Sequence, residues 1–208
     1  MDLSQAYVTL FSELGGVFSM ALVSLVGLVV VVVDAFRNDH PSLPWMGAAA
    51  MVGGIGWELL ALGDPSGAAL FGAVRTGGFA AFVNIIILAS GLVTIILSVP
   101  YLKRIGHNHG EVYALLMFAT VGMLMLATAN SLISVFVGLE TMSVCLYVLT
   151  GLVREDEGAI EAALKYFLLG AFSTGFFLYG IALMYGATGT MVLPAMAEGL
   201  AAAGGAGL

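Results

Sequence analysis

The feature that most constrains this chain is a series of long apolar runs that carry almost no charge. A helix that spans a membrane needs about 20 mostly apolar residues, and such runs cover 15–33, 45–63, 78–99, 112–153 and 158–185. Only 9% of the 208 residues are charged, whereas a soluble domain has about a quarter. Because the chain cannot cover a water-exposed globular surface, we predict a bundle of membrane-spanning helices.

The run 112–153 decides the number of helices. As one helix it would be roughly 60 Å long, about twice the thickness of the hydrocarbon layer. We therefore predict two helices, with a turn at 128–131 (Thr-Ala-Asn-Ser), the most polar tetrapeptide in the run. The fold class is all-α: a polytopic membrane bundle of about six transmembrane helices over 1–190. An Ala- and Gly-rich tail over 191–208 is expected to be a loop or a chain that stops early.

Composition excludes several function classes. The net charge of -7 argues against nucleic-acid binding, which needs basic patches. The single cysteine, Cys145, excludes a disulfide framework and a Cys-rich metal or iron–sulfur site; it is expected to be a small packing residue. His107 and His109 have no third ligand near them in sequence, so we interpret them as part of a solvated loop. The glycines of 53–56 lack the strand context of a dinucleotide loop and indicate close helix packing.

The basic residues predict an orientation. Cytoplasmic loops of membrane proteins carry an excess of Lys and Arg. An external N-terminus places four of the five loop cations in the cytoplasm and leaves Arg75 outside; the four are Arg37, Lys103, Arg104 and Arg154. Pro100, followed by Lys103 and Arg104, should end the helix that begins near residue 78.

Glu140 is the most informative residue, because a carboxylate in the middle of a spanning helix costs several kcal/mol unless it is paired or carries protons. Ser143 and Tyr147, at i+3 and i+7, lie on the same side of the helix and form a short polar stripe. The stripe predicts that Glu140 faces the bundle interior and exchanges a proton. The alternative is a fixed ion pair or hydrogen bond that only locks the helices together.

Lys165 is the second charge at membrane depth. Glu161 stands at i-4, in the favourable order for an ion pair on one helix, and Lys165 could also extend to the cytoplasmic interface. Counted from the cytoplasmic ends of antiparallel helices, Glu140 lies roughly 19 Å deep and Lys165 roughly 10 Å deep. The offset of about 9 Å exceeds a direct salt bridge, so either water connects the two side chains or the partner of Glu140 lies elsewhere. Glu13 and Glu58 are expected at the membrane interface.

The segments that contain these charges resemble a known family. They read Phe136-Val-Gly-Leu-Glu140-Thr-Met-Ser and Glu161-Ala-Ala-Leu-Lys165-Tyr-Phe, and 111–123 and 178–189 agree as well. The sequence is similar, over nearly its whole length, to the antiporter-like membrane subunits of the proton-pumping NADH:quinone oxidoreductase, respiratory complex I, and in particular to its subunit N.

The resemblance implies a fold of about fourteen helices built from inverted repeats, of which this chain would be the N-terminal part. It implies that Glu140 is the channel carboxylate, paired with a lysine on a seventh helix that this chain lacks, and that Lys165 belongs to the same proton path. Alone, the chain would be unable to pump. NADH, FMN, iron–sulfur clusters and quinone would be bound by other subunits, and the partners would be the other membrane-arm subunits in a bacterial plasma membrane.

Two alternatives stay open. One is a subunit of a multi-subunit sodium/proton antiporter, which shares the antiporter-like fold. The other is a non-catalytic membrane scaffold in which Glu140 and Lys165 only fix the packing of helices.

The sequence departs from the family at one position. In the family, the position before the third helix usually holds an acidic residue; here the segment is Ala73-Val-Arg-Thr76, which puts the role of that position in doubt.

Overall fold

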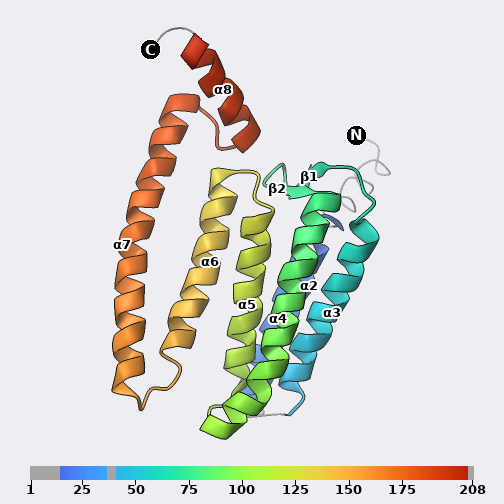
Figure 1. Cartoon of the computed structure of the whole chain (residues 1–208), viewed down its shortest axis with the longest axis vertical. Helices are drawn as coiled ribbons and strands as arrows, with labels where there is room; N and C mark the ends of the chain where they lie inside the picture. The colour runs from blue at the N-terminus through green and yellow to red at the C-terminus, as the bar shows by residue number, and fades with distance from the viewer. Residues whose placement is uncertain (1–14, 37–40, 206–208) are drawn as a thin grey trace.

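The computed structural model describes residues 15–36 and 41–205, and the predicted helical bundle is confirmed over them. Glu13 and Arg37 lie outside these ranges. The long helices stand side by side, and a short one lies across their end (Figure 1). The elements are α2 (Phe18–Phe36), α3 (Leu43–Ala61), β1 (Gly67–Ala69), β2 (Val74–Thr76), α4 (Gly78–Ile105), α5 (Gly110–Ala127), α6 (Leu132–Thr150), α7 (Glu157–Thr188) and α8 (Leu193–Gly205).

Five of the described helices are long and apolar enough to cross a membrane: α2, α4, α5, α6 and α7. Helix α3 has 19 residues but contains Glu58 and several glycines, which lower its hydropathy. It nevertheless packs along both α2 and α4, so it stands in the same layer as the spanning helices. The bundle therefore has six long helices in its described part, as predicted.

The predicted turn at 128–131 is confirmed, because α5 ends at Ala127 and α6 begins at Leu132. The two helices pack closely through glycines. A Cβ added to Gly122 would lie 2.5 Å from the backbone nitrogen of Met142, and one added to Gly138 would lie 2.7 Å from that of Leu126. The backbones thus meet with no side chain between them, two residues before Glu140.

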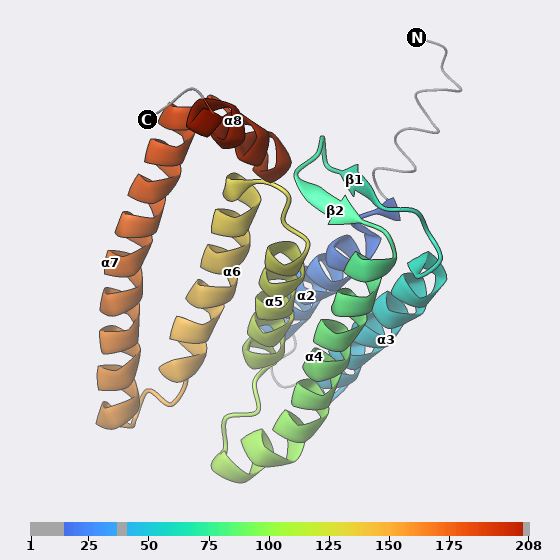
Figure 2. The ribbon, with the colours of Figure 1, turned by 45° about the horizontal axis from the view of Figure 1, so that its top comes forward.

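Pro100 does not end α4, so that prediction is wrong. The helix continues to Ile105 and ends at Gly106, which adopts the left-handed conformation, with φ of 78°, that glycine tolerates without strain. Proline removes one backbone donor, but apolar surroundings favour helix over exposed backbone, so prolines are tolerated inside membrane helices. The last turns of α4 bend away from the axis of the rest of the helix (Figure 2).

The composition of the tail predicted a loop, but most of the tail is helical, because α8 covers Leu193–Gly205. Alanine has the highest helix propensity, and Pro194 stands in the first turn, where its missing N–H costs nothing. The segment before α8 is held by two backbone bonds: Leu132 N–H donates to Met191 and Leu193 N–H donates to Asn130. The end of the bundle thereby fixes the start of α8.

A small β-hairpin is the one departure from an all-α fold among the described residues. Strands β1 and β2 pair antiparallel, and Val74 also bridges to Ala129 in the turn between α5 and α6. The hairpin therefore covers the same end of the bundle as α8 (Figure 2). Four backbone or side-chain groups of 128–131 form hydrogen bonds with the hairpin. These bonds join the α3–α4 connection, which contains the hairpin, to the α5–α6 turn.

Burial is uneven across the bundle. The apolar core lies among α2, α3, α4 and α5 and includes fully buried Met51, Leu88, Met117 and Leu124. In contrast, Ile181 is the one buried residue of the 32 in α7. Large apolar side chains cover the outer faces of α4, α6 and α7, as expected for surfaces in contact with lipid or other membrane helices.

Candidate proton-carrying site

Glu140 lies in the middle of α6 and faces α7. Its carboxylate is half-buried, and the Thr174 hydroxyl of α7 donates to its Oε1 atom at 2.7 Å. Thr150, the last residue of α6, is ten residues away, roughly 15 Å along the helix. Glu140 therefore points at a neighbouring helix rather than into a headgroup layer, and its bond crosses between two membrane helices.

Tyr147 packs on the same face of α6, two turns from Glu140. Its ring makes edge-on contacts with Tyr166 and Phe167 of α7, with ring centroids 4.7 and 5.8 Å apart. Gly170 makes room for it, since a Cβ there would overlap the Tyr147 hydroxyl. Ser143 stands between Glu140 and Tyr147 along α6 and is half-buried. The predicted stripe therefore lies at or beside the α6–α7 interface.

Lys165 forms an ion pair with Glu161 on its own helix. The two side chains are 70% and 65% exposed, so water or lipid headgroups can reach both. Thr174, which marks the level of Glu140 on α7, is nine residues beyond Lys165, or about 14 Å along the helix. Lys165 and Glu140 thus have different partners at different depths, as the sequence predicted.

Thr174 is a site residue that the sequence analysis missed. The signal was present, because Ser173 and Thr174 are the only serine and threonine in the apolar stretch 166–187. Sequence alone does not say which residue of α7 stands level with Glu140, since that depends on the length and course of the 151–156 loop.

Glu58 is buried among the helices near the end of α3, where the sequence predicted a position at the membrane interface. It is 6% exposed and lies one turn before the end of α3. The Ser19 hydroxyl of α2 donates to Glu58 Oε1 at 2.5 Å, and the Asn84 side-chain amide of α4 donates to the same atom at 3.0 Å. These two partners on other helices keep the carboxyl inside the bundle. The sequence of α3 alone indicated only that the helix has a polar residue near its end.

The predicted role of the glycines at 53–56 is confirmed for two of them. A Cβ on Gly54 would lie 3.1 Å from Leu88, and one on Gly53 would lie 3.2 Å from Leu22, whereas Gly56 has open space around it. These close approaches bring α3 against α2 and α4 and so bring Glu58 within reach of its two donors.

Arg75 lies in the segment where the resembling family usually has an acidic residue, and it makes a structural contact. Its Nε–H donates to the Asn130 side-chain oxygen at 3.0 Å, while the Asn130 amide donates to the Gly72 carbonyl at 2.8 Å. Arg75 thus ties the hairpin to the α5–α6 turn.

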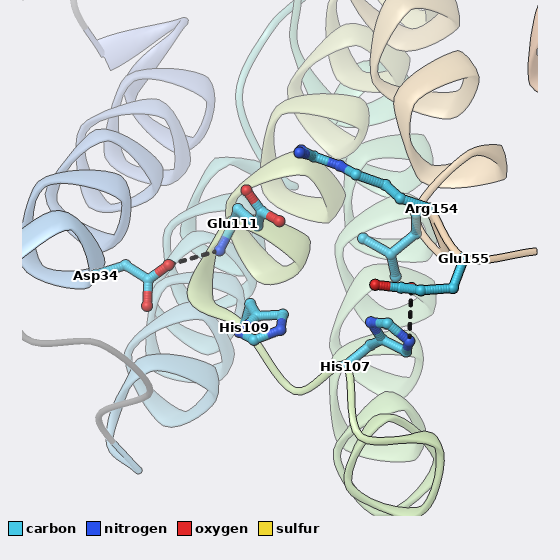
Figure 3. Close-up of a pocket in the computed structure, with 7 residues that line it drawn as sticks. Asp34, His107, His109, Glu111, Arg154 and Glu155 are labelled. Carbon is cyan, nitrogen blue, oxygen red and sulfur yellow. Dashed lines mark hydrogen bonds and ion pairs between the residues drawn. The ribbon is translucent and has the colours of Figure 1, made fainter. Parts of the chain in front are cut away.

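A cavity of about 450 Å³ lies at the opposite end of the bundle, between the α4–α5 and α6–α7 connections (Figure 3). Asp34 Oδ2 accepts from the Glu111 backbone N–H at 3.2 Å, and His107 Nε2 lies 3.7 Å from Glu155 Oε2. Within 15–36 and 41–205 no group of three His, Cys, Asp or Glu residues is arranged to hold a metal ion. The first contact joins α2 to the start of α5, and the second joins the α4–α5 connection to the α6–α7 connection. The lining residues are Asp34, His107, His109, Glu111, Leu152, Arg154 and Glu155.

Comparisons with known proteins agree with this architecture. Residues 129–206 match the model of the family described as NADH:quinone oxidoreductase/Mrp antiporter, TM. The chain is 66% identical over 197 residues to NADH-quinone oxidoreductase subunit N of Salinibacter ruber, covering 95% of this chain and 40% of that protein. It is 36% identical over 208 residues to the subunit N of Trichlorobacter lovleyi, covering 99% and 42%.

Solved structures show the same relation. A chain of respiratory complex I from Thermus thermophilus superposes with a TM-score of 0.71 at 30% identity, over 88% of this chain and 41% of that chain. A chain of an archaeal membrane-bound sulfane sulfur reductase matches with a TM-score of 0.74 at 20% identity, over 89% and 40%, which shows the fold alone. The chain spans about two fifths of the length of these relatives. Almost the whole of this chain is thus similar in sequence and fold to the corresponding two fifths of subunit N.

Proposed function

We propose that this chain supplies helices of a membrane-arm subunit of NADH:quinone oxidoreductase, and that Glu140 takes up and releases protons in transport coupled to NADH oxidation and quinone reduction. The observation that carries the proposal is the position of Glu140, half-buried in the middle of α6, with the Thr174 hydroxyl as its hydrogen-bond donor. A carboxyl at that depth is retained for function more often than for packing.

The hydrogen-bond partner of Glu140, the Thr174 hydroxyl, favours a role in proton transfer rather than in a fixed ion pair. A hydroxyl can donate to the ionised carboxylate and accept from the protonated acid, so Thr174 can serve Glu140 in both protonation states. Within the described residues no salt bridge is recorded for Glu140.

Lys165 and Glu161 would act at the cytoplasmic end of the path. Their exposure lets an ion pair on α7 open and close in contact with water. The proposed orientation has the N-terminus outside a bacterial plasma membrane. Lys103 and Arg104 lie in the last turn of α4 and Arg154 lies in the α6–α7 connection. Both elements are at the end of the bundle opposite to β2 (Figure 1), the strand that contains Arg75.

The redox groups would belong to other subunits of the same complex. An iron–sulfur cluster needs several cysteine ligands, and this chain has one cysteine, Cys145, which is buried in α6. We therefore propose other membrane-arm subunits, together with the lipid bilayer, as the partners of this chain.

The test is Glu140→Gln in the bacterial complex that contains the chain, with Glu198→Gln on exposed α8 as the control. Vesicles are assayed for proton uptake and NADH oxidation, and the amount of assembled complex is measured on native gels. We expect Glu140→Gln to lower pumping by about a hundredfold, the scale of a lost proton-transfer group, and the control to leave it unchanged. Full pumping by Glu140→Gln would refute the assignment, and loss of assembly with normal pumping per complex would favour a scaffold.

The sodium/proton antiporter is the second candidate, because the matching family description names both kinds of protein. The same vesicles distinguish the two. Transport that requires sodium and continues without NADH would favour the antiporter, whereas transport that stops when NADH is withheld supports the redox-coupled function.

A further inference from the structure

A second buried carboxyl lies far from Glu140, in the half of the bundle formed by α2, α3 and α4. Ser19 and Asn84 both donate to the same atom of Glu58, Oε1. An ionised carboxylate has about four acceptor positions on its two oxygens. Because both helix partners use one oxygen, the other oxygen can gain or lose a proton without breaking either bond.

A cavity of about 430 Å³ adjoins this carboxyl. Its lining includes buried Glu58 and Asn84 and, towards the β-hairpin, the exposed residues Asp64 and Arg75. One water occupies about 30 Å³ of liquid volume, so the cavity has room for several. It therefore connects a buried carboxyl with charged residues at the surface.

Asn84 independently indicates water in this cavity. The residue is 3% exposed, and its Oδ1 atom has no hydrogen-bond partner in the described structure. Its amide nitrogen already donates to Glu58, which fixes the direction of the oxygen. A buried acceptor without a donor costs about 1–3 kcal/mol, and a water molecule would supply the missing donor.

We propose that Glu58 is a proton-binding site that exchanges protons, through water in this cavity, with the aqueous phase at the β-hairpin end of the bundle. A hydronium ion in the cavity transfers its proton to Glu58 Oε2, leaving a neutral acid and a water, and the reverse step releases the proton. The charged groups that line the route are Asp64 and Arg75. The site depends on none of the residues around Glu140.

The donor set favours a proton over a metal cation. Ser19 and Asn84 both point donors at Glu58, whereas a bound cation needs several oxygens that point lone pairs at it. The free acceptors are one carboxylate oxygen and one amide oxygen, which suit a hydrogen-bonded water.

The first test is labelling with a hydrophobic carbodiimide in membranes that contain the protein. The reagent takes the proton of a carboxylic acid and adds to its oxygen, and in apolar surroundings the product rearranges to a stable adduct that mass spectrometry can locate. We expect an adduct at Glu58 that disappears as the pH rises and is absent from Glu58→Gln. Exposed Glu198 is the internal control and should carry no stable adduct. Labelling of Glu58 that does not change with pH, or no labelling at any pH, would overturn the proposal.

The second test asks whether water reaches the cavity and uses Cys145→Ser as the background. Ala81 lines the cavity, whereas Leu88, about two turns further along α4, is fully buried in the core and does not line it. We expect a small cationic thiosulfonate added on the hairpin side to modify Ala81→Cys and to spare Leu88→Cys. If both cysteines stay unmodified, the cavity is dry and the proposed route is wrong. Both tests are independent of pumping by Glu140.

Discussion

The glycine contact between α5 and α6 gives a quantitative test of how Glu140 is positioned. A Cβ on Gly122 would lie 2.5 Å from the backbone nitrogen of Met142 and 2.8 Å from the carbonyl oxygen of Gly138. Because these are backbone atoms, no side-chain rotation can relieve the contact. An unstrained contact is about 3.5 Å, so Gly122→Ala should push the two helices apart by about 1 Å near Glu140.

Two effects should follow from this separation. Overpacking of a close contact costs about 1–3 kcal/mol, so the variant should unfold at lower temperature in detergent. A shift of about 1 Å at a reacting group can lower its rate by about a hundredfold. We therefore expect Gly122→Ala to reduce proton pumping even where the complex assembles.

Gly56→Ala is the matched control for this prediction. Gly56 is also inside a helix, but a Cβ there would meet nothing within 4 Å. Replacing a helical glycine with alanine in open space should stabilise the helix by about 0.5–1 kcal/mol. The assays are thermal unfolding of the purified complex and proton uptake by vesicles. If Gly122→Ala and Gly56→Ala behave alike in both, the backbone contact does not position Glu140 and the reasoning fails.

Three further predictions concern polar contacts. Thr174→Val should lower pumping, whereas Thr174→Ser, which keeps the donor to Glu140, should retain it; equal pumping by the two variants would show that the hydroxyl is dispensable. Lys165→Gln should change the unfolding temperature very little, because exposed ion pairs such as Lys165–Glu161 contribute about 0–1 kcal/mol, yet it should slow pumping measured in vesicles. Asn130→Ala should destabilise the hairpin by about 1–3 kcal/mol, seen as faster amide hydrogen exchange over 67–76 with unchanged exchange in α2.

The elements fixed by membrane thickness were predictable from sequence. The run 112–153 is too long for one helix, and its polar tetrapeptide marks the turn that the structure shows between Ala127 and Leu132. Rules taken from soluble proteins failed where the surroundings differ. Pro100 does not end α4, since an apolar environment penalises exposed backbone more than one lost bond.

The position of Glu58 could not be predicted, because it depends on contacts between helices. Its place near the end of α3 is compatible with an interface, and the donors that bury it come from residues 39 positions before and 26 positions after it. Glu140 was easier to interpret, since its distance from both helix ends excludes an interface whatever its partners are. A single sequence reveals the depth of a charge in a helix, but the partners of that charge follow from helix packing.

The two buried carboxyls differ in a way that separates their chemistry. Glu58 receives two donors from two other helices, and both bonds persist when its other oxygen is protonated. Glu140 receives one donor, a hydroxyl that can also accept, on a helix with a single buried residue. Protonation of Glu140 can therefore reverse the direction of the hydrogen bond that joins α6 to α7, whereas protonation of Glu58 leaves α2, α3 and α4 joined as before. A proton that binds Glu140 can alter the contact between α6 and α7, whereas a proton that binds Glu58 leaves the contacts among α2, α3 and α4 unchanged.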